Sequence, residues 1–173
     1  HVTYDRAGSA YASVDPGRYN WASLLHGAEW LFVSGITAAL GDMPLAALRS
    51  AMAAAKSMAV KIAFDTNFRP ALWHGREAQA AEILRQLSCQ ADLLFAGRRA
   101  TAMMLGGDYG IGDPDRGFHE AAEAMFAAAP GLQHMAATRR VIHSSDRQDI
   151  TALIADRDGM SASDNIALEH IVD

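Results

Sequence analysis

A short apolar run of strand length, residues 58–64, lies between two segments with helical patterns. The first is alanine-rich and extends over residues 42–57, and the second extends from residue 75 to about residue 87. A strand between two helices is the unit from which parallel sheets are built, and ligands bind at the carboxyl ends of such strands. The residues that directly follow Phe64 are therefore expected at the ligand-binding edge of a sheet.

Three polar side chains, Asp65, Asn67 and Arg69, follow this strand at alternate positions. Pro70 disfavours the α region for Arg69, so the segment is predicted to stay extended. A carboxylate, an amide and a guanidinium at the edge of a sheet suit a polar, anionic small molecule, because the planar guanidinium matches a carboxylate. The alternative is that these groups satisfy one another and that Asp65 caps the following helix.

The same pattern recurs along the chain. Further strands are predicted over residues 30–34, 91–96 and 134–138, followed by a hairpin of residues 150–155 and 161–166 about a turn at 156–159. Helices are predicted between them, including a short one over residues 19–28, with a loop at 35–37 and a helix start capped by Asp42. This alternation predicts an α/β protein with a doubly wound, mostly parallel sheet.

The composition of the chain argues against several classes of function. A formal net charge of −5 argues against nucleic acid as a partner. The single cysteine excludes a disulfide framework and favours a cytoplasmic setting. No apolar run reaches the ~20 residues that span a bilayer, so no membrane contact is expected. The histidines lack zinc-site spacing, and no P-loop or dinucleotide-binding glycine pattern is present.

Two other groups of residues are weaker candidates for binding. Residues 1–14 are predicted to form a strand or hairpin arm in which Tyr4 and Arg6 share a face, where they could contact a sugar hydroxyl and a carboxylate. The arginine pairs 98–99 and 139–140 could meet phosphate. Exposed, solvated surfaces are the alternative for both groups. The abrupt N-terminal start indicates a chain that begins inside a larger fold.

Residues 65–73 resemble the D-x-N-x-R-x-x-L-W motif of the ribokinase-like PfkB carbohydrate kinases, particularly those that act on 2-keto-3-deoxygluconate. Residues 2–10 resemble the lid segment of that family, and residues 34–37 resemble its Ser-Gly-Ile-Thr loop. Ala91 and Asp92 match the opening of the strand before the family's Asn-x-x-Glu motif. The resemblance implies a ribokinase-like domain with helices on both faces of the sheet. Residues 1–14 would belong to its β lid and residues 15–173 to the central part of the α/β domain.

The implied activity is the ATP-dependent transfer of phosphate to a hydroxyl of a keto-deoxy sugar acid, with Mg²⁺ neutralising the phosphates. Tyr4 and Arg6 would hold the substrate from the lid, and Arg69 would bind its carboxylate. Asp65 and Asn67 would line the site near the transferred phosphate. One residue, Arg139, is a candidate contact to the nucleotide, whereas no metal-ligating residue is assigned. A homodimer formed through the lid is also expected.

Two departures from the family pattern bear on activity. The Asn-x-x-Glu motif is replaced by residues 96–99, Ala-Gly-Arg-Arg. The family's Gly-Ala-Gly-Asp motif, which supplies an anion hole and an aspartate base, would be expected just after Asp173. The chain by itself is therefore predicted to be an inactive part of a kinase. The alternatives are a PfkB kinase of another sugar or a nucleoside, and a non-catalytic module that binds a sugar acid.

Overall fold

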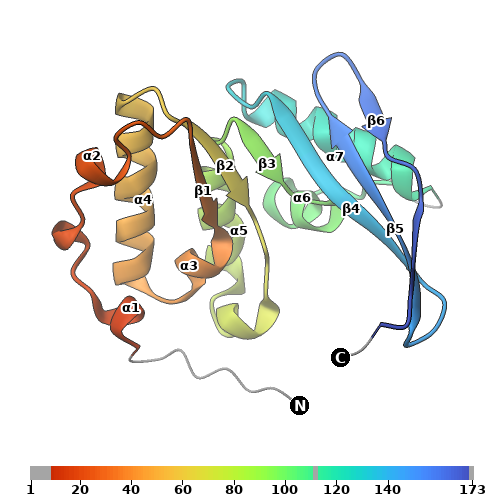
Figure 1. Ribbon diagram of the computed structural model, residues 1–173, viewed down its shortest axis with the longest axis horizontal. Coiled ribbons are helices and arrows are strands. Elements are labelled where there is room, and N and C mark those ends of the chain that lie inside the picture. Colours follow the sequence, from red (N-terminus) through yellow and green to blue (C-terminus); the bar gives the residue numbers. More distant parts are fainter. Residues whose placement is uncertain (1–8, 111–112, 172–173) are drawn as a thin grey trace.

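The computed structural model describes residues 9–110 and 113–171, whose strands form one mixed sheet (Figure 1). β1 to β4 are parallel to one another and adjacent in chain order, and β5 pairs antiparallel with β4. β6 and β7 both pair antiparallel with β5. The strands are β1 (Trp30–Ser34), β2 (Lys61–Asp65), β3 (Leu93–Phe95), β4 (His134–Ile142), β5 (Arg147–Ala155), β6 (Met160–Ala162) and β7 (Ile166–Glu169). The predicted α/β fold is thus confirmed, with a mixed sheet in which β1 to β4 are parallel.

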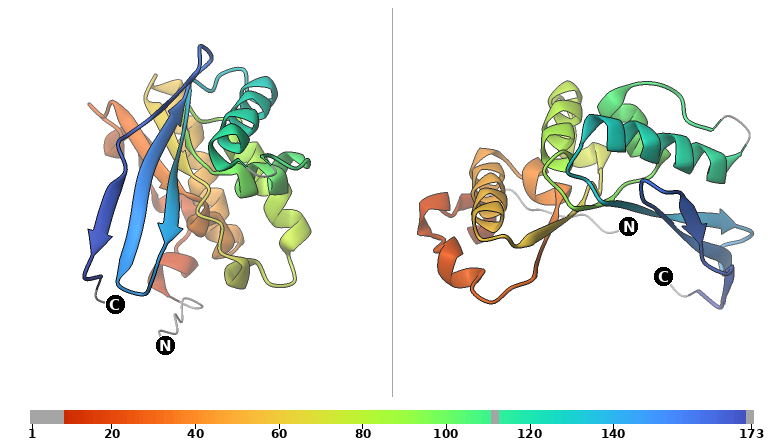
Figure 2. Two further views of the ribbon diagram at one scale, coloured as in Figure 1. Left: turned by 90° about the vertical axis from the view of Figure 1, so that its right-hand side faces the viewer. Right: turned by 90° about the horizontal axis from the view of Figure 1, so that it is seen from above.

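The parallel strands are connected by helices that lie along one side of the sheet. Right-handed crossovers that advance in one direction along a sheet place every connecting helix on the same face. α4, α5 and α7 accordingly lie together on one side in Figure 2. The helices are α1 (Ala10–Ser13), α2 (Trp21–Leu24), α3 (Gly35–Ala39), α4 (Asp42–Ser57), α5 (Glu77–Ser88), α6 (Arg98–Leu105) and α7 (Pro114–Ala128), with 3₁₀ turns η1 (Pro16–Arg18) and η2 (Pro70–Trp73).

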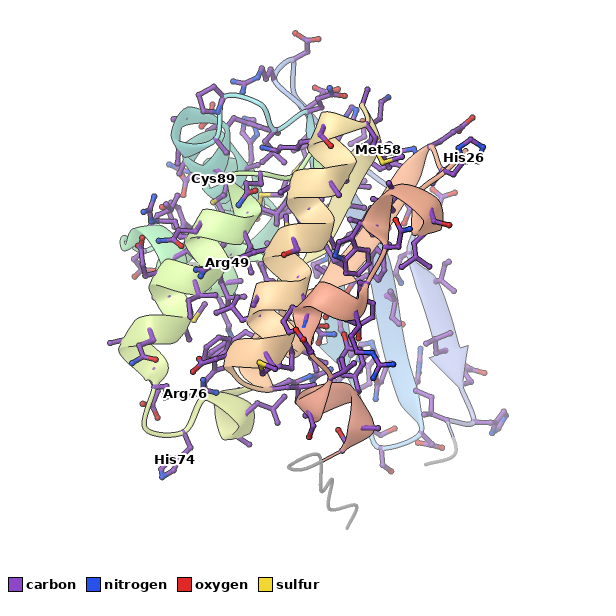
Figure 3. The ribbon with its side chains drawn as sticks, turned by 90° about the vertical axis from the view of Figure 1, so that its left-hand side faces the viewer. His26, Arg49, Met58, His74, Arg76 and Cys89 are labelled. Carbon is purple, nitrogen blue, oxygen red and sulfur yellow. The ribbon has the colours of Figure 1, made fainter. Side chains whose placement is uncertain are left out.

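The core lies between the sheet and these helices. Side chains alternate between the two faces of a strand, so Ile62 and Phe64 of β2 point to the same side. Both are completely buried, as are Leu94 of β3 and Met135 of β4. The helices contribute buried residues to the same core, among them Met52, Leu84 and Met125. At the helix surface, Arg49 of α4 donates a hydrogen bond to Gln86 of α5, and Figure 3 shows Arg49 facing that helix.

Several local predictions were wrong. The helix predicted over residues 19–28 shortens to α2, since Asn20 caps its start and a turn with Gly27 at φ 74° follows its end. The predicted loop after β1 is the helix α3, which begins at Gly35 with Ser34 as its cap. Gly41, not Asp42, is the N-cap of α4.

The predicted N-terminal strand arm falls largely outside the described residues, which begin at residue 9. Of the part that is described, Ala10–Ser13 forms the short helix α1, in which the Ser9 hydroxyl accepts a hydrogen bond from the Ala12 N–H. A polar side chain that bonds the first free N–H groups favours a helix start over a strand. The lid assignment of residues 1–8 stays a prediction. None of the helices in residues 9–110 and 113–171 combines the length and apolar character needed to cross a membrane.

Candidate functional site

Polar residues at the ends of β1 and β2 meet at the carboxyl-terminal edge of the sheet. Ser34, the last residue of β1, is in register with Asp65, the last residue of β2. Asp65 is in register with Phe95, the last residue of β3. Three strand ends therefore coincide at the edge where parallel sheets bind ligands.

Asp65 and Asn67 are held in one small turn. The backbone N–H of Asn67 donates to Oδ1 of Asp65 over 3.0 Å, and Asn67 adopts a φ of 36°. Asparagine tolerates this left-handed region better than most residues do. The prediction of a fully extended segment is therefore wrong at Asn67, whereas Arg69 before Pro70 is extended as predicted, with φ −123° and ψ 100°.

Ser34 belongs to the same cluster. Its hydroxyl oxygen accepts a hydrogen bond from the backbone N–H of Ile36, and the Asn67 amide nitrogen lies 3.4 Å from it. Between Asp65 and Asn67, the buried Thr66 donates through both its backbone N–H and its hydroxyl to the carbonyl of Phe95. Ser34, Asp65 and Asn67 thus form a polar cluster whose backbone is bonded to the neighbouring strand.

Burial raises the pKa of the Asp65 carboxyl above its ordinary value of 3.8. The hydrogen bond from the Asn67 backbone and the positive charge of Arg69 lower the same pKa, but burial has the larger effect. Perturbed carboxyl groups are common at functional sites, although structural groups show such shifts too. The shift is therefore consistent with a ligand-binding role for Asp65 at this edge.

The segment that carries Arg69 is held in place by a buried tryptophan at its end. Trp73, at the end of η2, is buried in the core. Arg76 lies 5.1 Å over its ring and donates to the carbonyls of Ala39 and Leu72. Figure 3 shows Arg76 where this loop enters α5, beside the lower end of α4. The Arg69 side chain itself is exposed, so a fixed backbone presents a solvent-accessible guanidinium.

A cavity of about 1220 Å³ opens beside the cluster. Asp65 and Asn67 contribute to its wall, together with Gly97 and Arg99 from the start of α6. The remaining wall is mostly apolar and comes from β3, the first half of β4, β5, β6, α6 and the segment before η2. It includes Phe68, Phe95, Ala136, Ala152 and Ile154. This volume exceeds that of a typical small-molecule site, so the cavity is large enough for a sugar acid.

The structure does not bring Arg139 to this cavity. Its guanidinium donates to Oδ2 of Asp115 over 2.6 Å and to the Thr151 hydroxyl over 3.2 Å. Arg98 donates instead to the carbonyls of Tyr109 and Gly110. These arginines are engaged in structural contacts, and the nucleotide contact of Arg139 stays a prediction. Tyr4 and Arg6 lie outside the described residues.

The described residues offer few groups that could hold Mg²⁺ or nucleotide phosphates. No three His, Cys, Asp or Glu side chains come together in residues 9–110 and 113–171 in a way that could hold a metal ion. Arg99 is a charged arginine at the cavity wall, but the neighbouring Arg98 is bonded to protein carbonyls. The described residues therefore do not form a complete Mg²⁺–nucleotide site by themselves.

The sequence predicts Asp65 and Asn67 as site residues, whereas Ser34 enters only through the resemblance of the loop at residues 34–37. A serine at a strand end next to glycine was the available signal, and it is common on its own. The wall formed by β4 to β6 was missed entirely, because alanines and isoleucines in strands carry no sign of a ligand. Only the register of the sheet places them beside Asp65.

Comparison with known proteins gives the site a context. The chain is 34% identical over 119 residues to the 2-dehydro-3-deoxygluconokinase of Thermoproteus tenax, covering 69% of this chain and 34% of that protein. This confirms the resemblance to the PfkB carbohydrate kinases. No protein-family model matches the chain.

Two solved structures extend the resemblance to the whole chain. A PfkB family carbohydrate kinase from Listeria grayi superposes with a TM-score of 0.88 at 27% identity, and the 2-dehydro-3-deoxygluconokinase of Thermotoga maritima with a TM-score of 0.89 at 25% identity. Each match covers 100% of this chain and 51% of the other. This chain thus spans about half the length of these solved relatives, and it has their ribokinase-like fold.

Proposed function

We propose that this chain is the acceptor-binding part of an ATP-dependent sugar kinase that phosphorylates a hydroxyl of 2-keto-3-deoxygluconate or a similar sugar acid. The observation that carries the proposal is the cluster of Ser34, Asp65 and Asn67 at the sheet edge, beside a cavity and next to the exposed Arg69. The likeness to two 2-dehydro-3-deoxygluconokinases supports the same reaction.

Arg69, two residues of the cluster and the lid each have a role in this proposal. Arg69 binds the carboxylate of the sugar acid, because its planar guanidinium can donate two parallel hydrogen bonds. Asp65 and Asn67 orient the acceptor hydroxyls near the transferred phosphate. Tyr4 and Arg6 are proposed to close over the substrate from the lid. ATP with Mg²⁺ would supply the phosphoryl group.

The chain alone is proposed to bind the acceptor without turning over ATP. The described residues lack a complete Mg²⁺–nucleotide site, and Ala96 and Arg99 stand where the family's Asn-x-x-Glu motif has its asparagine and glutamate. Phosphoryl transfer depends almost entirely on positioning and on neutralising the phosphate charge, so a chain without these groups lacks the main source of catalysis.

A second candidate is a non-catalytic module that binds a sugar acid. The observation that favours it is the engagement of Arg98 with two protein carbonyls, at the position of the altered motif. It predicts acceptor binding without nucleotide binding, even in a longer chain. A kinase of a neutral sugar is disfavoured by the exposed charge of Arg69 beside the cluster.

The experiment begins with the intact mass of the purified protein, which is 18.5 kDa for these 173 residues. Calorimetry with 2-keto-3-deoxygluconate is expected to show binding that a neutral sugar such as fructose does not match. A coupled assay for ATP turnover is expected to show none for the 18.5 kDa chain. Sugar-dependent turnover would contradict the proposal of an inactive part, and stronger binding of fructose would contradict the sugar-acid assignment.

The proposal also includes the oligomeric state of the protein and its location in the cell. A homodimer through the lid is proposed because an unpaired strand edge in such an arm can be covered by a second copy. Light scattering at micromolar concentration checks it, and a monomer would contradict it. We place the activity in the cytoplasm, as expected for a chain whose single cysteine, Cys89, is free.

A further inference from the structure

Two segments build the candidate acceptor site, and both start at the ends of strands. β1 continues directly into α3, with the Ser34 hydroxyl at the start of that helix. The segment after β2 carries Asn67 and Arg69 and ends in η2. At the strand ends the two segments meet, because the Asn67 amide nitrogen lies 3.4 Å from the Ser34 hydroxyl. Arg69 lies beyond this contact, so its distance from the polar cluster depends on other contacts.

One arginine, Arg76, joins the far ends of these two segments. It is the N-cap residue of α5 (Figure 3), and its Nη2 donates to the carbonyl of Ala39 over 2.7 Å and to that of Leu72 over 3.3 Å. Ala39 is the last residue of α3, and Leu72 lies within η2. The last carbonyls of a helix lack partners inside the helix, and a cationic side chain is a favourable donor to them. Arg76 therefore holds the end of α3 against η2.

The guanidinium of Arg76 is itself held in this position. Its central carbon lies 5.1 Å from the centre of the buried Trp73 ring, and the Arg76 backbone N–H donates to the Trp73 carbonyl over 2.7 Å. In the part of the chain that the structure describes, no carboxylate forms an ion pair with Arg76. The charge is thus directed at two backbone carbonyls and an aromatic face, which a planar guanidinium can contact together and an ammonium cannot.

The contacts of Arg76 lead to both parts of the site by short routes. The backbone N–H of Leu72 donates to the carbonyl of Arg69 over 2.9 Å, so the residue whose carbonyl is bound by Arg76 also fixes the backbone of Arg69. On the other side, α3 begins at Gly35, directly after Ser34, and ends at the carbonyl that Arg76 binds. Arg76 is therefore connected to Arg69 through Leu72 and to Ser34 through one short helix.

We propose that Arg76 is a positioning residue that sets the distance between the Arg69 guanidinium and the polar cluster, so that one sugar acid can contact both. Arg76 is not part of the cavity wall, so it acts through the two segments and not by touching the ligand. Holding a binding group in place before the ligand arrives raises affinity, because less freedom is lost on binding. The effect on binding rests on the proposed function, whereas the effect on the two segments does not.

The first test is a double-mutant cycle on the 173-residue chain, with calorimetry of 2-keto-3-deoxygluconate. Arg76→Ala is expected to weaken binding by about three- to tenfold, because a released Arg69 side chain must be ordered when the ligand binds. In a chain that already carries Arg69→Ala, the same substitution is expected to change the affinity by less than about twofold, since residues that act through one another are not additive. A purely structural role would give the same loss in both backgrounds.

Two further variants separate positioning from a loss of charge or of stability. Arg76→Lys keeps the charge but lacks the planar fork, so it is expected to recover only part of the affinity. Arg85→Ala is the matched control, because Arg85 lies on the same helix, loses the same charge and pairs with Glu82 at the surface. It is expected to leave binding unchanged. Thermal unfolding checks that each variant folds, and Arg76→Lys carries the test if the alanine variant does not fold.

The second test is amide hydrogen exchange, which reports local opening without any ligand. Arg76→Ala is expected to speed exchange of the Leu72 and Leu40 N–H groups by about fivefold, the effect of losing one hydrogen bond. Leu72 lies in the segment that Arg76 holds, and the Leu40 N–H belongs to the peptide group whose carbonyl, that of Ala39, Arg76 binds. The Thr66 N–H, which is bonded to the neighbouring strand, is expected to exchange at an unchanged rate.

The two tests keep this inference apart from the proposed function. If the unmodified chain does not bind the sugar acid, the proposed function fails, and exchange at Leu72 and Leu40 decides the role of Arg76. Unchanged exchange at both groups overturns the inference. A loss of affinity that is equal with and without Arg69, or that Arg85→Ala reproduces, also overturns it.

Discussion

The carbonyl oxygen of Thr66 occupies the space in which residue 35 would carry a Cβ, so only glycine fits at Gly35. A Cβ there would also meet the side chain of Leu84. Thr66 cannot easily retreat, because its backbone N–H and its hydroxyl are both bonded to the Phe95 carbonyl. This close approach brings the hydroxyl of Ser34 to the amide of Asn67, and the polar cluster depends on it.

Gly35→Ala is therefore expected to destabilise the fold by about 1–3 kcal/mol, the cost of overpacking a closely packed site. The measurement is the free energy of unfolding in urea. Gly131→Ala is the matched control, because a Cβ at Gly131 meets no atom within 4 Å. Equal stability of the two variants would show that the approach of α3 to Thr66 is not tight.

Asp65→Asn tests the burial of the Asp65 carboxyl through the pH dependence of stability. The pKa of this group is higher in the folded chain than its ordinary value of 3.8. Protonated Asp65 therefore stabilises the fold, and this contribution is complete below the unfolded pKa and is lost as the pH rises through the folded pKa. The asparagine variant is neutral throughout, so its free energy of unfolding should improve relative to the unmodified chain as the pH rises above 3.8.

Asp149→Asn is a control for which the pH dependence of stability is expected to have the opposite sign. The hydrogen bond from His143 holds the pKa of Asp149 below its ordinary value, with a further contribution from Asn165. The ionised Asp149 therefore stabilises the fold, and that contribution is lost as the pH falls through the folded pKa. The free energy of unfolding of the unmodified chain should therefore increase relative to that of Asp149→Asn as the pH rises. The same trend for Asp65→Asn would contradict the burial of Asp65.

The α/β fold and the candidate cluster could both be predicted from the sequence, each for a different reason. The buried residues 62–64 of β2 are all apolar, and the helix of residues 42–57 shows a clear apolar stripe. Parallel topology then places strand ends at one edge without any knowledge of side-chain contacts. Asp65 and Asn67 could be located by this argument alone.

Features that depend on packing could not be predicted. Nothing local indicates that Asn67 turns to a φ of 36° or that Gly35 approaches Thr66. The extent of β4 to Ile142 depends on its partner β5, since Arg139 and Arg140 are not typical of a buried strand. For the same reason, a pair of arginines suggested phosphate binding, whereas Arg139 is bonded to Asp115.

Arg139→Ala is expected to lower the free energy of unfolding, because Arg139 links β4 to the start of α7 through its ion pair with Asp115. The side chains of Arg139 and Asp115 are each about one-third exposed, so solvent weakens the ion pair between them. We therefore expect the free energy of unfolding to fall by about 0.5–1 kcal/mol. A double-mutant cycle with Asp115→Ala measures the coupling by urea unfolding. Arg140→Ala, at the exposed neighbouring position, is the control. No coupling between residues 139 and 115 would return Arg139 to the candidates for nucleotide contact.

Arg69→Ala is expected to weaken binding of 2-keto-3-deoxygluconate by about tenfold, because a hydrogen bond to a charged group contributes ~1.5–3 kcal/mol. Arg69→Lys should recover only part of this loss, since an ammonium cannot match a carboxylate with two parallel donors. Arg49→Ala is the matched control, because Arg49 bonds Gln86 at the helix surface (Figure 3). Calorimetry with the sugar acid and with fructose separates a charge effect from general damage. A tenfold loss confined to the sugar acid supports carboxylate recognition by Arg69, whereas equal losses for both sugars would show that the guanidinium only supports the loop.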